Sequence, residues 1–293
     1  MIRIDFSLNH LPEKKEGLTL ALGNFDGLHL GHQSLVKEAE LLPSPTGILF
    51  FKRPYLSTRP ILSSVEDKIR YCAPFSLDCA YILDNDPSFY SLSKEDFVSL
   101  LKELGTQRVV VGEDFRFGKG QEGGIEELRK AFETHVVPLL LLNGKKVSST
   151  QIREDLLAGD VEGAKALLGR PYEIVGEVVH GLSNGRKIGF PTLNLQTYCN
   201  YLLPQNGVYA GLVYLSGIPY KAMINVGTNP TIGKLSSPLA EAHLIGADVD
   251  GYGKRAYFSF LKRIRGERKF ASLEELSQQL KIDEGVCQRY FEE

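Results

Sequence analysis

The sequence predicts two domains of different class: an α/β domain with a parallel sheet, then an antiparallel β-barrel or sandwich with a C-terminal helix. Three observations predict this order. The length of 293 residues is about twice that of an average domain. Apolar runs alternate with helical stretches in the first half, as βαβ units require. Near residue 169 the pattern changes to period-two runs between glycine turns, which is typical of antiparallel strands.

The first half alternates regularly. We expect strands at residues 18–22, 47–51, 79–83, 108–111 and 136–141, and helices at residues 31–42, 66–72, 93–104 and 124–134. The third helix has the clearest ends, because Ser93 is suited to cap it and Gly105 follows its last turn. Strands separated by helices of this length predict a parallel sheet.

The second half begins with two short helices, at residues 149–158 and 161–168, which end at Gly169. Period-two strands are expected at residues 172–179, 207–215, 220–226, 240–244 and 256–261, and a last helix at 272–292. We therefore place the domain boundary after residue 168, giving domains of residues 1–168 and 169–293.

Composition excludes several classes of protein. With 43% hydrophobic and 24% charged residues, the chain is not a disordered one. The net charge, 34 basic minus 36 acidic residues or -2, lacks the basic excess of a dedicated nucleic-acid binder. Four cysteines without a CxxC pair argue against a metal knuckle or redox dithiol. The start has no signal-peptide core and no apolar stretch can span a bilayer, so we expect a cytoplasmic protein without a membrane partner.

A first candidate site is the segment GNFDGLHLGH at residues 23–32, between an expected strand and helix. Backbone N–H groups and the dipole of the helix favour an anion there. His29 and His32 flank Gly31, which would let a phosphate approach the backbone closely, and both imidazoles could reach that phosphate. The plainer alternative is a glycine turn with two surface histidines.

Two further segments follow the same expected sheet edge. VGEDFRFG at residues 111–118 comes after a buried strand, and SSTQIR at residues 148–153 begins a helix. Ser149 either caps this helix or binds phosphate, and Arg153 lies one turn further on the same face. The segment GEDFRFGK at residues 112–119 is not a P-loop, because five residues separate its glycines and Gly120 replaces the magnesium-binding hydroxyl.

These motifs, in this order, resemble the adenylyltransferase module of the bacterial bifunctional riboflavin kinase/FMN adenylyltransferase (FAD synthetase) family, whose nucleotidyltransferase fold carries an HxGH signature. The resemblance implies that His29 and His32 contact the ATP phosphates and stabilise charge. It also places in the nucleotide site Gly23, Asn24, Phe25, Asp26, Gly31, Asp114, Arg116, Ser149, Thr150 and Arg153.

One segment departs from this family. After its second strand the family usually has a motif like FDPHP near the flavin nucleotide, whereas this chain has FKRPY at residues 51–55. Lys52 and Arg53 replace an acid and a proline. A basic pair suits the FMN phosphate, so we expect both to bind flavin nucleotide.

A second candidate site is the segment GRKIGFPTLNL at residues 185–195. Thr192 and Asn194 are two residues apart in an extended stretch, so they point to the same side. Both carry hard oxygen donors that suit Mg²⁺. Alternatively, they satisfy backbone groups of a β-turn.

This segment resembles the GxPTAN motif of riboflavin kinases, with Leu193 in place of the alanine. The resemblance implies a Greek-key barrel with a terminal helix, and an ATP site that includes Gly185, Lys187, Gly189, Pro191, Thr192 and Asn194, the last two as Mg²⁺ ligands. It makes Glu241 the candidate base, although a surface glutamate on an edge strand is the plainer reading of Glu241 alone. It makes Arg265 a flavin contact and gives His243 no role.

Together the resemblances imply two reactions on one chain. The barrel phosphorylates riboflavin with ATP and Mg²⁺ to give FMN, and the first domain transfers AMP from a second ATP to FMN, giving FAD. The partners are small molecules only, and we expect a monomer or weak oligomer. Two rival readings remain: a riboflavin kinase whose first domain has lost adenylyl transfer, and a flavin or nucleotide sensor without turnover.

Overall fold

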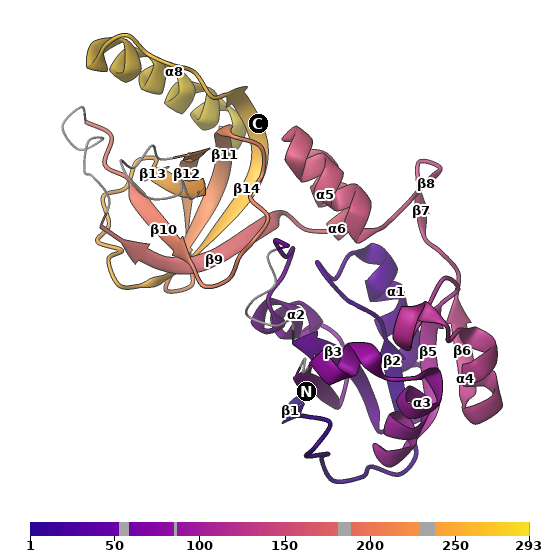
Figure 1. Ribbon diagram of the computed structural model, residues 1–293. Helices are drawn as coiled ribbons and strands as arrows, with labels where there is room; N and C mark the ends of the chain where they lie inside the picture. Colours follow the sequence, from indigo (N-terminus) through magenta and orange to yellow (C-terminus); the bar gives the residue numbers. More distant parts are fainter. Residues whose placement is uncertain (53–58, 85–86, 181–188, 229–237, 293) are drawn as a thin grey trace. The chain divides into compact units, whose positions relative to one another are not determined.

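A computed structural model describes residues 1–52, 59–84, 87–180, 189–228 and 238–292 (Figure 1). Of the expected site residues, Arg53, Gly185 and Lys187 lie outside these ranges. The chain folds into two compact units. We call residues 1–59 and 63–149 the N-terminal unit, and residues 60–62 and 150–293 the C-terminal unit.

The N-terminal unit is built on a six-stranded sheet in the order β1-β4-β3-β2-β5-β6, in which every neighbouring pair is parallel. Its strands are β1 (Ile2–Phe6), β2 (Leu18–Leu22), β3 (Thr46–Lys52), β4 (Cys79–Asp84), β5 (Thr106–Gly112) and β6 (Glu133–Val137). The central strands are buried on both faces, as a parallel sheet requires.

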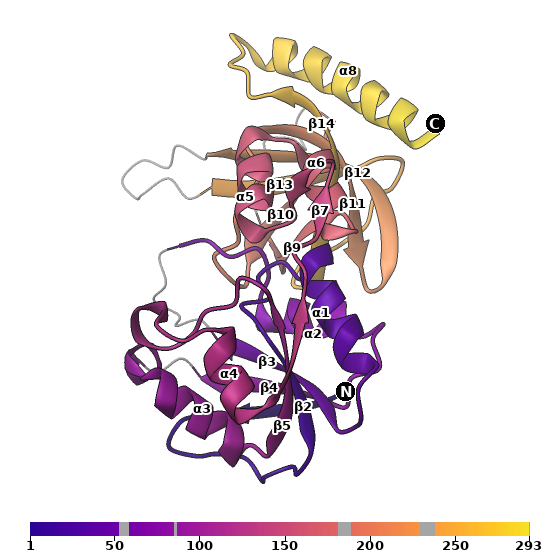
Figure 2. The ribbon, with the colours of Figure 1, turned by 90° about the vertical axis from the view of Figure 1, so that its right-hand side faces the viewer.

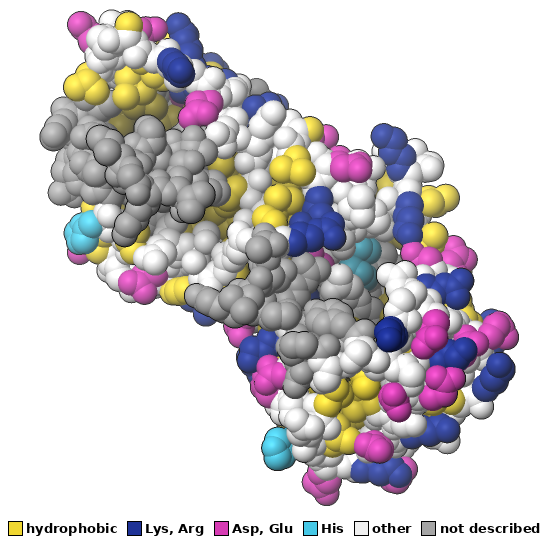
Figure 3. Space-filling view, viewed as in Figure 1, with side chains coloured by type: hydrophobic (Ala, Val, Ile, Leu, Met, Phe, Trp, Pro, Cys, Tyr) yellow, Lys and Arg dark blue, Asp and Glu magenta, His cyan; other side chains and the backbone are white. Residues whose placement is uncertain are grey.

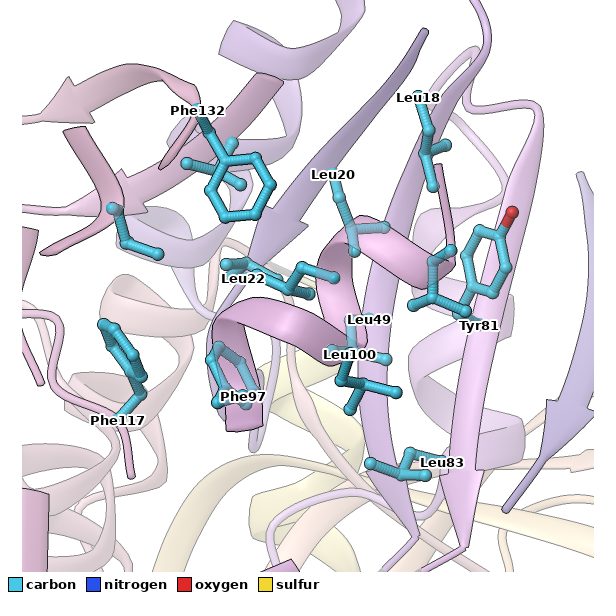
Figure 4. Packing of buried hydrophobic residues seen from close by; sticks show 14 of the residues in the cluster. Leu18, Leu20, Leu22, Leu49, Tyr81, Leu83, Phe97, Leu100, Phe117 and Phe132 are labelled. Atoms are coloured by element: carbon cyan, nitrogen blue, oxygen red, sulfur yellow. The ribbon is translucent and has the colours of Figure 1, made fainter. Parts of the chain in front are cut away.

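Helices cover both faces of this sheet. In Figure 2, α3 (Lys94–Glu103) and α4 (Ile125–Ala131) lie on one side of the strands, and α1 (Leu30–Glu40) and α2 (Val65–Cys72) on the other. Under α3, the side chains of Phe97 and Leu100 pack on Leu20, Leu22 and Leu49 (Figure 4). Short 3-10 turns at Pro87–Ser91 and Lys119–Gln121 and a small hairpin, β7 (Leu141–Leu142) with β8 (Lys145–Lys146), complete the unit.

The C-terminal unit is a closed antiparallel barrel in the order β10-β13-β12-β11-β14-β9. Helices α5 (Ser149–Ala158) and α6 (Val161–Leu168) precede it, and α8 (Leu273–Glu292) packs on β11, β12 and β14. The strands are β9 (Tyr172–Val179), β10 (Leu193–Thr197), β11 (Gly207–Leu215), β12 (Ile218–Thr228), β13 (Pro238–Leu244) and β14 (Arg255–Gly266). The predicted fold class is therefore confirmed for both halves.

Some predicted elements were wrong in detail. The strand expected at 136–141 is β6, at 133–137, because Pro138 cannot donate to a ladder and ends it. The start of β6 was not predicted because Glu133 and His135 are polar and interrupt the apolar run. An edge strand such as β6 tolerates polar residues. The sequence did not reveal β1 or β10. The compact units divide after Ser149, and the functional boundary at 168/169 stays a prediction.

The surface of the N-terminal unit seen in Figure 3 mixes acidic and basic side chains rather than gathering one sign. Within the described part of the chain, no helix is long and apolar enough to cross a membrane.

Candidate active sites

The motif at residues 23–32 forms the turn from β2 into α1, at the carboxyl edge of the sheet where ligands bind in such folds. Two non-glycine residues of this turn, Phe25 (φ 50°) and Leu28 (φ 40°), adopt left-handed backbone. Such residues cost about 1–3 kcal/mol each, and here both side chains are fully buried, which offsets the strain. The turn is therefore a strained segment held in place by the core.

Two histidine rings stack at this turn. His29 caps α1 by accepting a hydrogen bond at Nδ1 from the His32 backbone N–H (3.2 Å), and the ring centroids are 3.6 Å apart. Because Nδ1 accepts, the proton of neutral His29 lies on Nε2. Burial, and next the charges of His29 and Lys68, hold the pKa of His32 well below its usual value, so its ring is neutral at pH 7. Within the described residues, its buried Nδ1 has no hydrogen-bond partner, which a ligand could satisfy.

Gly31 lies against the ring of His29. A Cβ added there would lie 3.2 Å from Nδ1 and 3.3 Å from Cε1 of His29. The absence of a side chain at Gly31 thus leaves room for the His29 ring, and the approach of a phosphate to the Gly31 backbone stays a prediction. The absence of a side chain at Gly23 likewise leaves room for the Phe25 ring, because a Cβ added there would lie 3.2 Å from it.

Hydrogen bonds hold the turn from two other segments. The Asp26 carboxylate, 2% exposed, accepts from the Ser63 backbone N–H (3.2 Å), and the Gly27 N–H donates to Ser63 Oγ (2.7 Å). Ser149 Oγ donates to the Asp26 carbonyl (2.8 Å). Asp26 and Ser149 therefore brace the turn, whereas their expected contacts with ATP stay predictions.

A lysine that sequence reasoning missed lies beneath the turn. Lys68 on α2 is 4% exposed, donates from Nζ to the Asn24 carbonyl (3.1 Å) and lies 5.6 Å from the centre of the Phe50 ring. The signal was present, because Lys68 falls between Val65 and Cys72 on the apolar stripe of its helix. A lysine in such a stripe is a candidate for a buried cation beside an anion site.

Asp114 and Arg116 follow β5 as expected, and both are exposed. Asp114 pairs with Lys146 Nζ on β8 (2.5 Å). The Arg116 guanidinium lies so close to Gly124, the N-cap of α4, that a Cβ at this glycine would collide with it. That both line the ATP pocket stays a prediction.

Two other predicted residues have structural partners, and a third is exposed. Arg153 on α5 is buried and donates to the Pro60 carbonyl (2.8 Å), while Thr150 on the same helix is exposed. Lys52, the described member of the basic pair, forms an ion pair with Asp84 (3.0 Å). An FMN phosphate at Lys52 would compete with this carboxylate.

In the C-terminal unit, a hollow of about 320 Å³ is lined by Pro191, Thr192 and Asn194. Two further lining residues are Leu193 of β10 and Leu244 at the end of β13. The others lie in the loop after β13: Ala247, Asp248, Val249, Asp250 and Tyr252. Gly189 precedes these residues in left-handed backbone (φ 84°). The structure thus brings Pro191, Thr192 and Asn194 to one cavity as predicted, whereas Gly189 is not among its lining residues. The loop residues were not predicted.

Glu241 lies on β13 directly opposite Asn194 of β10 on one side and Asn225 of β12 on the other. Directly opposed residues of an antiparallel pair lie on the same face with Cβ atoms about 5 Å apart. Burial raises the pKa of the Glu241 carboxyl. A raised pKa makes its carboxylate a stronger base. Glu241 does not itself line the cavity, but Asn194, which lies opposite it, does.

Thr192 and Asn194 suit Mg²⁺ by their chemistry, because both offer neutral oxygen donors at a cavity large enough for phosphate oxygens. Mg²⁺ usually takes only one or two protein ligands, with substrate phosphates and water completing its shell. Within the described residues, no group of three or more His, Cys, Asp and Glu could hold a metal.

Arg265, the expected flavin contact, is held by α8. Its Nε lies 3.1 and 2.9 Å from the two oxygens of Asp283, and its Nη2 lies 2.7 Å from Oδ2. Asp283 is 2% exposed. This pair fastens α8 to β14, and contact of Arg265 with flavin stays a prediction.

Comparison with known proteins relates each half of the chain to an enzyme family. The profile of the FAD synthetase family matches residues 11–151, and that of the riboflavin kinase family matches residues 168–291. A bifunctional riboflavin kinase/FMN adenylyltransferase of Escherichia coli K12 is 35% identical over 309 aligned residues, which cover 99% of this chain and 97% of the relative. The protein of that name from Bacillus subtilis is 33% identical, covering 96% of this chain and 95% of its own.

Among solved structures, a crystal structure described as a macrolide-efflux protein from Streptococcus pneumoniae has a TM-score of 0.87 and 31% identity. It covers 98% of this chain and 99% of its own. This similarity extends the agreement in fold over both units.

Proposed function

Because the chain belongs to the family of bifunctional riboflavin kinases and FMN adenylyltransferases, we propose that it converts riboflavin to FAD in two transfers from ATP. The C-terminal unit makes FMN and ADP, and the N-terminal unit makes FAD and diphosphate. The observation that carries this proposal is the relation, over nearly the whole chain, to relatives named for both activities. It disfavours a kinase without adenylyl transfer and a sensor without turnover.

In the kinase reaction, the ribityl 5′-oxygen of riboflavin attacks the γ-phosphorus of ATP, and ADP leaves. Glu241 accepts the hydroxyl proton, and burial raises the pKa of this carboxyl toward a more useful base. Thr192 and Asn194 would hold Mg²⁺, which supplies neutralisation of phosphate charge when bound. The backbone around Gly189 and Pro191 adds to the ATP site, and Arg265 contacts flavin.

In the adenylyl transfer, an FMN phosphate oxygen attacks the α-phosphorus of ATP, and diphosphate leaves. His29 donates from Nε2, because its Nδ1 already accepts from the backbone. His32 is neutral and also offers a single N–H, and the α1 N-terminus adds its partial positive charge. Lys52 binds the FMN phosphate after its ion pair with Asp84 is broken. The other partners are riboflavin and ATP only, and the chain works in the cytoplasm as a monomer or weak oligomer.

Incubation with riboflavin, ATP and Mg²⁺, followed by separation of the flavins, tests the proposal. FMN together with FAD is the expected result. FMN alone would support a kinase that has lost adenylyl transfer, and unchanged riboflavin would support a sensor.

A further inference from the structure

His243, for which the sequence offered no role, joins three parts of the barrel. Its Nδ1 lies 2.8 Å from the Pro191 carbonyl oxygen, and its Nε2 lies 3.5 Å from Glu284 Oε1 on α8. The edge of its ring packs with Phe190, with centroids 5.1 Å apart. The whole residue is 9% exposed, so the imidazole is part of the packed structure between β13 and α8.

The contact with Pro191 bears on Thr192, because the β10 ladder begins only after that residue. The first paired residue is Leu193, opposite Ala242, and Thr192 precedes this pair. Strand pairing therefore fixes Asn194 but leaves Thr192 outside the ladder. The Pro191 carbonyl belongs to the peptide plane that leads into Thr192, so a hydrogen bond to it sets the direction of the Thr192 backbone.

The proton positions on the ring follow from its neighbours. A carbonyl oxygen only accepts, so Nδ1 of His243 carries hydrogen and donates to Pro191. In the neutral ring Nε2 then carries no hydrogen, so Glu284 Oε1 at 3.5 Å is a neighbour on α8 and does not accept a hydrogen bond from it. The hydrogen bond to Pro191 and the packing against Phe190 therefore orient the imidazole.

We infer that His243 is a positioning residue of the kinase site, whose Nδ1–H donor fixes the Pro191–Thr192 peptide and so aims the Thr192 hydroxyl into the cavity. This inference depends on the proposed kinase function. His243 acts through Thr192 and does not touch the reacting atoms. Its loss should weaken nucleotide binding mainly when Mg²⁺ is present, because Thr192 is an expected Mg²⁺ ligand.

Two variants of nearly equal polarity separate this role from simple packing. In His243→Asn, the side-chain amide nitrogen occupies the place of Nδ1 and keeps the donor to Pro191. In His243→Gln, the amide nitrogen lies near the place of Nε2 and the donor to Pro191 is lost. The measurement is the Kd of ADP by calorimetry, with and without Mg²⁺, on the full chain. Conversion of FMN to FAD by the same preparations is the folding control.

We expect His243→Gln to raise the Kd of ADP with Mg²⁺ by about 10- to 100-fold and to lower FMN formation similarly. Without Mg²⁺ the Kd should change little, and His243→Asn should stay near wild type. Equal loss in both variants, or a wild-type Kd in His243→Gln, would overturn the inference. A wild-type chain that makes no FMN would instead contradict the proposed function, so the two failures are distinguishable.

Discussion

Replacing Glu241 by glutamine tests the proposed base with the smallest change of shape. The side chain lies opposite Asn194 and Asn225 on adjacent strands, and burial raises the pKa of its carboxyl above the usual 4.5. Glutamine keeps the volume and removes the proton acceptor. A positioned base contributes about 10²- to 10⁴-fold, or about 2.7–5.5 kcal/mol of activation free energy, so FMN formation should fall by that factor.

The assay is the initial rate of FMN formation from riboflavin, with FMN-to-FAD conversion by the same preparation as control. The wild-type rate should fall as pH decreases through the raised pKa of Glu241, because a protonated carboxyl cannot accept the hydroxyl proton. This fall should begin at a higher pH than for an ordinary glutamate, and Glu241→Gln should abolish it. A loss below about 10-fold, or loss of both activities together, would refute the assignment.

Three further changes have defined outcomes. Gly31→Ala should lower FAD formation without lowering the melting temperature, because the new Cβ displaces the His29 ring while alanine favours a helix by up to about 1 kcal/mol; unchanged FAD formation would count against the stacked pair. Asp283→Asn should cost about 3 kcal/mol in urea unfolding, since it leaves Arg265 without its buried partner, and a cost under about 1 kcal/mol would show that this pair does not fasten α8. The pKa of His32 is lowered in the folded state, so below about pH 6.5 the unfolded chain binds one proton more than the folded chain. The free energy of unfolding should therefore rise with pH in this range, by at most about 1.4 kcal/mol per pH unit. His32→Asn should flatten this slope, and an unchanged slope would exclude His32 as its source.

The fold was predictable where the hydrophobic periodicity and the capping or turn residues indicated the same element. β2, α5, α6, β9 and β11 have the bounds that the sequence predicted. Ser93 caps α3 by accepting from the Asp96 N–H, and Gly169 ends α6 in left-handed backbone. In these cases local signals and burial favoured the same structure.

Prediction failed where long-range pairing determined the element. β1 is a mostly exposed edge strand that pairs with β4, more than 70 residues away in sequence, so no buried run marked it. β10 follows directly after the Pro191–Thr192 segment, and its pairing with β9 and β13 could not be read from five residues.

The site residues were found as motifs, but their partners were not. The sequence located His29 and His32 by spacing, yet only the structure shows that the ring of one fills the space beside Gly31. It likewise identified Glu241 without showing that Asn194 lies directly opposite. Side-chain contacts between distant segments depend on register, which the motifs do not encode.

The central claim is that one chain holds two separate sites, and mixing two variants that are each impaired in one transfer tests it most directly. Glu241→Gln, given riboflavin, ATP and Mg²⁺, should make FMN, and therefore FAD, about 10²- to 10⁴-fold more slowly than the wild type. The double variant His29→Asn, His32→Asn should accumulate FMN without FAD, and the mixture of both proteins should make FAD. FAD formed from riboflavin by Glu241→Gln alone at more than about a tenth of the wild-type rate, or a double variant that makes no FMN, would contradict the account.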